Sequence, residues 1–200
     1  MAVGLALLFI AHQYRLSLRP PELSAEETRI GLKTLRNLLI TVDRTEFGKK
    51  QRCKILTDKL RELLEKGRIR FSMNLDRECL YRQELGSEPL LYIAVSYGRY
   101  GPVWPDHDAL GRRIYHEALH GVIKSKQDSK QEECDAFCVA AEVVSAIEGR
   151  EVSYPVMKDG KSVWEWVNES YIDAPSDTNY HPLESSYEEL AVKVGIPQKK

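Results

Sequence analysis

The sequence predicts an α+β protein, in which a small, mostly antiparallel sheet packs against helices. Three observations carry this prediction. Apolar residues recur at helical spacing before residue 67, polar and apolar residues alternate between residues 68 and 97, and two more helical patterns follow up to residue 148. The chain has 200 residues, and no repeat or Gly/Ser-rich linker divides it. We therefore expect one domain over 1–200, with an N-terminal helical portion (1–67), a core (68–150) and a C-terminal extension (151–200).

The N-terminal third is predicted to form two helices. Ser24-Ala25-Glu26-Glu27 is a capping-box pattern, which favours a helix that starts there and continues through the apolar residues from Ile30 to Leu39. A second helix is expected from about Phe47 to Lys66, and Gly67 is its expected stop.

Strands are predicted in the middle of the chain. Residues 68–73 alternate polar and apolar side chains, as a half-buried strand does, and residues 78–82 are expected to form its short partner. The run LLYIAVSY at residues 90–97 has the strongest strand pattern, and glycines and prolines end it.

Two further helices are predicted after the strands. Asp106 is a good N-cap for a helix of about 18 residues, and Ser129 to Glu132 is a capping-box pattern for another helix, which Gly149 ends. The tail is expected to hold a hairpin or strand–helix unit over 152–167, with Asp159-Gly160 as its turn, and a short helix near 186–194.

Composition restricts the class of protein. Apolar residues make up 42% of the chain and charged residues 30%, with a net charge of −1, which argues against disorder, a nucleic-acid binder and a polybasic membrane anchor. The apolar run Ala2–Ala11 is shorter than the roughly 20 residues of a membrane span and lacks the flanks of an export signal. We expect it to pack into the core as a helix or strand, with an export signal or a membrane-edge segment as the alternative. Four cysteines do not make a disulfide scaffold, and Cys134 and Cys138 lack the spacing of a structural zinc site, so we expect a cytoplasmic protein with reduced thiols.

The segment HEALH, from His116 to His120, falls on the first of these later helices. Residues four apart on a helix lie on one face, about 5–6 Å from each other, so both imidazoles can reach one metal ion. Glu117 follows the first histidine and can lie beside a water molecule rather than on the metal, where it could act as a general base. The pattern H-E-x-x-H should arise by chance on the order of 0.01 times in such a chain. We therefore favour zinc over a helix whose histidines merely pack or face water.

A catalytic zinc site needs a third protein ligand. The sequence after HEALH lacks the H-x-x-G-x-x-H continuation, so a carboxylate on the next helix is the natural alternative, and Glu132, Glu133 and Asp135 are the candidates. Glu133 stands nine residues before Glu142, on the opposite side of the helix, and heads an apolar stripe. A carboxylate there is costly unless a metal compensates for it. We favour Glu133, and Glu132, which can serve as the capping-box residue, stays the alternative.

These patterns resemble the zincin metallopeptidases, specifically the gluzincin branch. LLYIAVSYG, then RRIYHEALHG, then EECDAFCVAAEVV are similar in layout to the small ImmA/IrrE-type repressor-cleaving peptidases. The resemblance covers about residues 90–148 and implies zinc binding, hydrolysis of extended peptides and a role in regulation or in phage and mobile-element biology. The chain departs from the family at ExxxD, whose Asp steadies a ligand histidine. The register that ends at Asp135 begins at Gln131, and the register that begins at Glu133 ends at Phe137.

Residues that would support the reaction are less well defined. Zincins stabilise the oxyanion with a Tyr, His or Arg. Tyr115 adjoins the motif but is expected to point elsewhere on the helix, and Tyr154, Tyr180 and His181 lie downstream, where families often recruit such a group. For each of them a packed or exposed aromatic ring is the alternative. Residues 90–97 form either the edge strand that pairs with an extended substrate or an interior strand. Trp104, Trp164 and Trp166 are expected in the core or in pocket walls.

The sequence therefore predicts a zinc-dependent endopeptidase. His116, His120 and Glu133 are expected to bind Zn²⁺, and Glu117 is expected to activate water. The alternatives are a non-catalytic zinc-binding regulatory or protein-interaction module and a helical regulator without metal. The same ligands also suit non-haem iron. The expected partner is a protein or peptide substrate, with no nucleic acid and no membrane, and the oligomeric state stays open.

Overall fold

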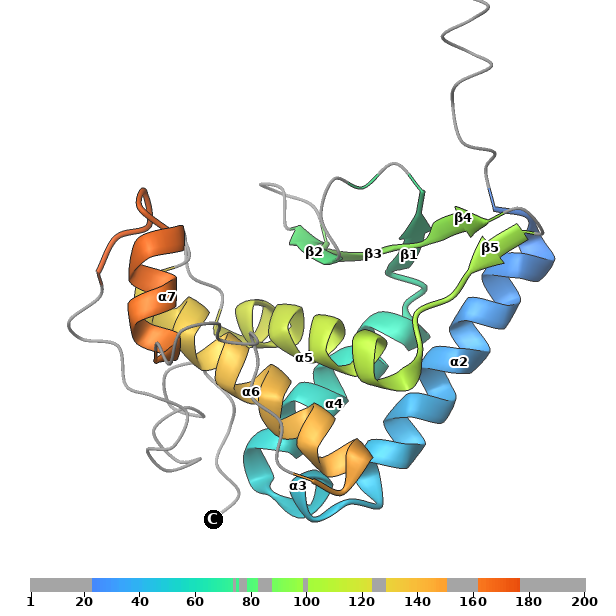
Figure 1. Cartoon of the computed structure of the whole chain (residues 1–200). Coiled ribbons are helices and arrows are strands. Elements are labelled where there is room, and N and C mark those ends of the chain that lie inside the picture. The colour runs from blue at the N-terminus through green and yellow to red at the C-terminus, as the bar shows by residue number, and fades with distance from the viewer. Residues whose placement is uncertain are drawn as a thin grey trace, which may run out of the picture.

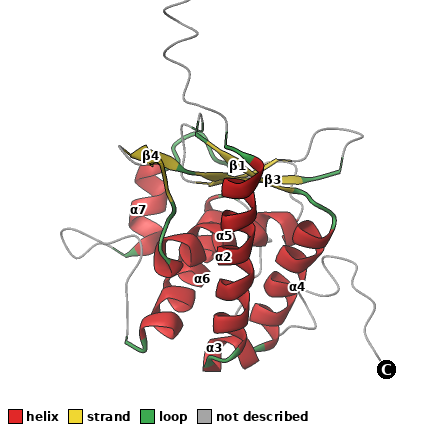
Figure 2. Cartoon of the chain, turned by 90° about the vertical axis from the view of Figure 1, so that its right-hand side faces the viewer, coloured by secondary structure: helices red, strands yellow, loops and turns green. Residues whose placement is uncertain are grey.

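The computed structural model describes residues 23–73, 75, 79–82, 88–98, 101–123, 129–150 and 162–176. Over these ranges the chain is α+β, as predicted, with a group of helices and a small sheet that covers one end of the group (Figures 1 and 2). The predictions for 2–11, for 152–161 and for 186–194 lie outside the described residues. The elements are α2 (Ala25–Asp43), α3 (Glu46–Lys49), α4 (Gln51–Glu65), β1 (Ile69–Ser72), β2 (Cys79–Arg82), β3 (Leu90–Ala94), β4 (Ser96–Gly98), β5 (Gly101–Val103), α5 (His107–Ile123), α6 (Lys130–Glu148) and α7 (Val163–Ser170).

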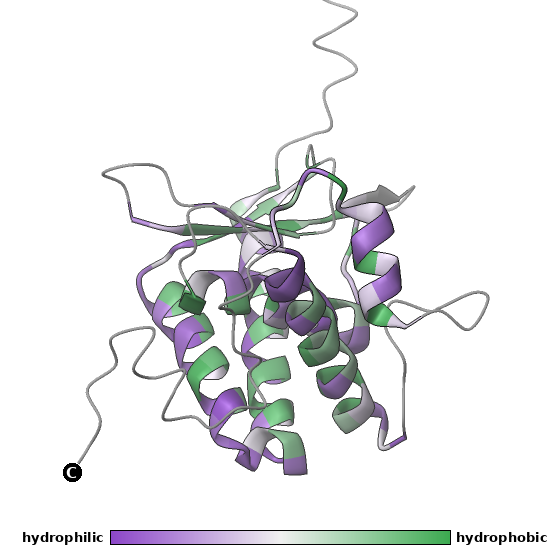
Figure 3. Cartoon of the chain, turned by 90° about the vertical axis from the view of Figure 1, so that its left-hand side faces the viewer, coloured by the Kyte–Doolittle hydropathy of each residue, from purple (hydrophilic) through white to green (hydrophobic). Residues whose placement is uncertain are grey.

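The N-terminal helices pack their apolar faces into the core. The capping box at Ser24 is present, with the Ser24 hydroxyl accepting from the Glu27 amide and the Glu27 carboxylate accepting from the Ser24 amide. The buried side chains of α2 recur at helical spacing, so its amphipathic pattern matches its packing. Figure 3 shows the apolar stripes of the helices turned toward one another.

The predicted helix from Phe47 to Lys66 is wrong at its start, because the chain forms two helices that meet at Lys50. Lys50 has an extended backbone, with φ −67° and ψ 141°. The short helix α3 is capped by Thr45 and lies tightly against the end of α2, where a methyl group at Gly48 would come within 2.0 Å of the Val42 carbonyl oxygen. The extended backbone of Lys50 therefore separates α3 from α4. The predicted stop at Gly67 is confirmed, since α4 ends at Glu65 and Gly67 has φ +62°.

The main sheet is three-stranded and mixed, in the order β1-β3-β2, rather than mostly antiparallel. β1 pairs with β3 in parallel and β2 pairs with β3 antiparallel, so residues 78–82 do not partner residues 68–73 as predicted. Leu91 and Ile93 on the central strand are fully buried, and this burial favours β3 over β2 as the neighbour of β1. The predicted strand 90–97 splits after Ala94, and its last residues pair with β5 in a separate antiparallel hairpin.

The two later helices form the centre of the molecule. The Asp106 carboxylate accepts from the Ala109 amide at 2.7 Å, which confirms it as the cap of α5. Gly149, with φ +68°, ends α6 as predicted. The helices cross closely at Gly111, whose missing side chain leaves room for Val143 and Ile147 of α6. In the described part of the chain, no helix has both the length and the apolar character that a bilayer crossing requires.

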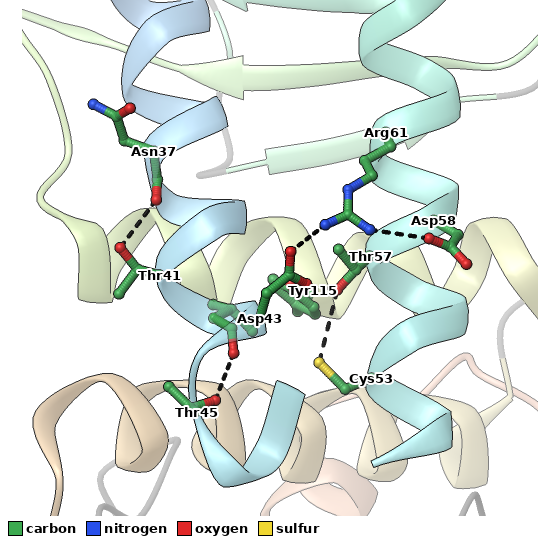
Figure 4. Close-up of polar contacts among 10 residues, drawn as sticks. Asn37, Thr41, Asp43, Thr45, Cys53, Thr57, Asp58, Arg61 and Tyr115 are labelled. Atoms are coloured by element: carbon green, nitrogen blue, oxygen red, sulfur yellow. Dashed lines mark hydrogen bonds and ion pairs between the residues drawn. The ribbon is translucent and has the colours of Figure 1, made fainter. Parts of the chain in front are cut away.

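A buried polar network fixes the rotation of α5 about its axis (Figure 4). Tyr115 is fully buried, and its hydroxyl lies 2.7 Å from the Thr57 hydroxyl on α4. Cys53 lies one turn earlier on α4, with its Sγ 3.7 Å from the same Thr57 oxygen. Burial raises the pKa of the Tyr115 phenol and raises that of the Cys53 thiol to about 11, so both groups stay protonated at neutral pH. Tyr115 therefore faces α4, in agreement with the expectation that it points away from the motif.

Candidate metal centre

Two histidines of α5 face the neighbouring helix α6. His116 and His120 lie one turn apart, and their Nε2 atoms are 3.3 Å from each other. Both side chains are largely removed from solvent, with 14% and 9% of their surface exposed. The helical spacing of HEALH thus places the two imidazole nitrogens at one point, as the sequence predicted.

Glu133 on α6 completes a group of three donors with these histidines. Its Oε2 lies 3.4 Å from His116 Nε2, and its Oε1 lies 3.7 Å from His120 Nε2. The carboxylate is buried, and its Oε2 has no hydrogen-bond partner within the described residues. Among the described residues, one group of three or more His, Cys, Asp or Glu side chains is close enough to hold a metal ion, and it consists of His116, His120 and Glu133.

Two of the separations between donor atoms fit a tetrahedral ion. Zinc binds imidazole nitrogen and carboxylate oxygen at roughly 2.0–2.2 Å, which places neighbouring ligand atoms of a tetrahedron about 3.3–3.6 Å apart. Adjacent ligands of an octahedral iron site would lie closer, at about 3.0 Å. The 3.3 Å between the two Nε2 atoms and the 3.4 Å from His116 Nε2 to Glu133 Oε2 agree better with the tetrahedron, and the 3.7 Å from His120 Nε2 is measured to the other Glu133 oxygen, Oε1. A buried carboxylate oxygen that lacks a hydrogen bond also fits a metal ligand, because a cation would compensate for its burial.

The environment of Glu133 keeps its carboxylate ionised. Burial acts against this and is the largest influence on its pKa. The close approach of His116, the charges of both histidines and a hydrogen bond with Tyr171 act in the opposite direction and together hold the pKa below its ordinary value. The ionised form is the one that binds a metal cation.

Glu132 supports the second histidine. It is 1% exposed, and its Oε1 lies 2.9 Å from His120 Nδ1. A proton on Nδ1 shared with this carboxylate leaves the lone pair of Nε2 directed toward Glu133, which is how outer carboxylates orient metal-bound histidines. Ser129 accepts from the Glu132 amide at 3.1 Å, but the Glu132 carboxylate is used on His120. The predicted role of the Glu132 side chain in a capping box is therefore wrong. Glu132, rather than the aspartate of an ExxxD motif, supports the ligand histidine His120.

Glu117 is held at the sheet. Its Oε2 accepts from the Tyr81 backbone amide of β2 at 2.7 Å. The Tyr81 ring lies flat against Gly121, where an added methyl group would come within 2.6 Å of it, so β2 and α5 are in direct contact beside the motif. In the described sheet, β2 is an edge strand and β3 is its interior strand. Of the two interpretations of residues 90–97, the interior strand is correct for the residues of β3.

Aromatic side chains line the other side of the histidines. The ring of Phe137 packs edge-on against His116, with centroids 4.6 Å apart, and Trp166 of α7 packs on Phe137 at 4.9 Å. Tyr171 follows α7 and contacts both Phe137 and Trp166. Tyr154, Tyr180 and His181 lie outside the described residues. Sequence reasoning missed Tyr171, whose one signal is its place at the end of an amphipathic helix.

The cysteines remain thiols, as expected. Cys53 and Cys79 are buried, Cys134 is half-buried and Cys138 is exposed, and none of them is part of the three-donor group. Comparison of the chain with protein families, curated proteins and solved structures finds no match, so a function must be inferred from the arrangement of these side chains.

Proposed function

We propose that the chain is a zinc-dependent endopeptidase with a zincin-like arrangement of its core. The observation that carries the proposal is the grouping of His116, His120 and Glu133, in which the two Nε2 atoms lie 3.3 Å apart and each lies within 3.7 Å of a Glu133 carboxylate oxygen. In the described residues three side chains share this site, which leaves a fourth position for water or a carbonyl oxygen. Open sites of this kind are typical of catalytic zinc, whereas structural zinc has four protein ligands.

Each side chain at the site would have its own role in hydrolysis. When bound, zinc supplies Lewis acidity, which lowers the pKa of a coordinated water and polarises the scissile carbonyl. Glu117 takes the water proton as the oxygen attacks the carbonyl carbon, and it passes this proton to the amide nitrogen as the C–N bond breaks. Glu132 keeps His120 in one tautomer throughout.

An extended peptide fits the surface beside Glu117. The Tyr81 amide donates to Glu117, so it points away from β3 and toward the free edge of the described sheet. In an antiparallel pair, the carbonyl of a residue points to the same side as its amide. The Tyr81 carbonyl is therefore available to a substrate backbone that lies along β2, next to the proposed base.

The test compares three purified full-length proteins. Wild type should bind one zinc per chain and cleave members of a quenched-fluorescence peptide library. Glu117→Gln should keep its zinc and lose about 10²–10⁴-fold in kcat/KM, while His120→Ala should lose the metal. Zinc binding without any cleavage would point to a non-catalytic metal-binding module, and wild-type protein that takes up no zinc would refute the proposal.

A further inference from the structure

The segment after α7 is attached to the helix that carries Glu133. The Lys130 backbone amide at the start of α6 donates to the Pro175 carbonyl at 3.0 Å, and the Lys130 ammonium donates to Asn168 Oδ1 at 2.8 Å. These contacts hold both ends of residues 168–175 one turn before Glu133. Tyr171 lies inside this segment, and its amide donates to the Val167 carbonyl at the end of α7.

Packing gives the Tyr171 ring a defined place beside the three donors. Its centroid is 6.2 Å from that of Phe137 and 6.0 Å from that of Trp166, both in edge-on geometry. Phe137 in turn packs on His116. From this place the Tyr171 side chain reaches the Glu133 carboxylate as a hydrogen-bonding neighbour, which helps to hold the pKa of Glu133 below its ordinary value. The phenol is a donor at neutral pH, since free tyrosine has a pKa of about 10.

We propose that the Tyr171 hydroxyl positions Glu133 for the metal, so that α7 and the residues after it are part of the metal centre. This inference rests on the proposed function. A glutamate side chain can turn about its last torsion angle, which exchanges the two carboxylate oxygens. A hydrogen bond to the carboxylate restricts this rotation, and it offsets charge on the carboxylate without competing for the ion. Outer groups of this kind typically change metal affinity by roughly 10–100-fold.

The first experiment measures zinc affinity, which needs no substrate. Zn²⁺ is titrated into full-length wild type, Tyr171→Phe and Tyr92→Phe in competition with a chromophoric chelator. Tyr92 is a half-buried tyrosine on β3, so its substitution is a matched control for loss of a hydroxyl. We expect Tyr171→Phe to weaken zinc binding about 10-fold or more, Tyr92→Phe to leave it unchanged, and the visible spectrum of bound Co²⁺ to change in Tyr171→Phe alone.

The second experiment separates positioning from a general effect on the fold. Cu²⁺ binds imidazole tightly, so its affinity can be measured with and without Glu133. We expect Tyr171→Phe to weaken Cu²⁺ binding in the wild-type background and to have no further effect after Glu133→Ala. Equal losses in both backgrounds, or equal zinc affinities of Tyr171→Phe and wild type, would overturn this inference and leave the proposed function intact. Wild type that binds neither ion would overturn both.

Discussion

The hydrogen bond between Tyr115 and Thr57 offers a test of how α5 is held in place. The two hydroxyl oxygens are 2.7 Å apart, and both side chains are fully buried. Thr57→Val removes one partner without changing the volume of the side chain and leaves the buried Tyr115 hydroxyl without its oxygen partner, beside only the Cys53 thiol, a weak acceptor. A buried hydroxyl left in this way costs about 1–3 kcal/mol. Tyr115→Phe should cost about 1 kcal/mol, at the lower end of that range, because Thr57 keeps its contact with Cys53 at 3.7 Å.

The double variant carries the discriminating result. Replacing both partners with apolar groups of the same shape removes the unsatisfied hydroxyl, so the double variant should cost no more than Thr57→Val alone, with a coupling of about 1–2 kcal/mol. The free energy of unfolding is measured by urea denaturation of all four proteins, followed by circular dichroism. For a chain of this size, each kcal/mol also lowers the Tm by about 2–4 °C. Additive losses would refute the view that this bond, rather than the packing of each ring and methyl group, fixes the helix.

Three further predictions concern the site and the charges around it. Glu132→Gln should weaken zinc binding about 10-fold or more, because the neutral amide orients His120 less strongly, and a competition titration that shows unchanged affinity would contradict this. Gly121→Ala should destabilise the fold by about 1–3 kcal/mol, because the new methyl group displaces the Tyr81 ring, and urea denaturation checks it against the exposed control Lys54→Ala. Burial is the main cause that raises the pKa of Asp108, followed by a hydrogen bond with Glu148 and the charge of Glu148. The ionised carboxylate of Asp108 therefore destabilises the folded state above this raised pKa. This destabilisation disappears as the pH falls below the ordinary pKa of Asp. Asp108→Asn should therefore raise the Tm at pH 7 and match wild type near pH 3, and an equal difference at both pH values would count against this explanation.

Local patterns predicted the helices of the core well, because their evidence lies within the chain itself. The caps at Ser24 and Asp106 and the stops at Gly67 and Gly149 require only nearby backbone groups. The break at Lys50 was not predicted in this way, since no glycine or proline stands at that residue. The strand order was missed because alternation shows that a segment is extended but not which strand becomes its neighbour.

In the candidate site, too, the features that depend on one helix were predicted and those that depend on packing between helices were missed. Helical spacing within one helix was sufficient to predict that His116 and His120 meet, and the position of Glu133 opposite Glu142 placed it toward the interior. The role of Glu132 on His120 could not be read in advance, because it depends on how two helices cross, and a capping box gave the same residue a sufficient local explanation. Tyr171 lies 38 residues beyond Glu133, and no short-range pattern connects the two.

Glu132 and Glu133 are consecutive residues, yet Glu132 contacts His120 Nδ1, the imidazole nitrogen that faces away from the proposed ion, and Glu133 faces the ion itself. Both contacts therefore depend on the same rotation of α6 about its axis, since the side chains of successive residues on a helix point in directions about 100° apart. A small rotation of α6 about its axis would move Glu133 away from the ion and Glu132 away from His120 at the same time. A shift of α6 should thus remove both contacts in one step, whereas replacing Glu132 alone weakens the centre and leaves Glu133 in place.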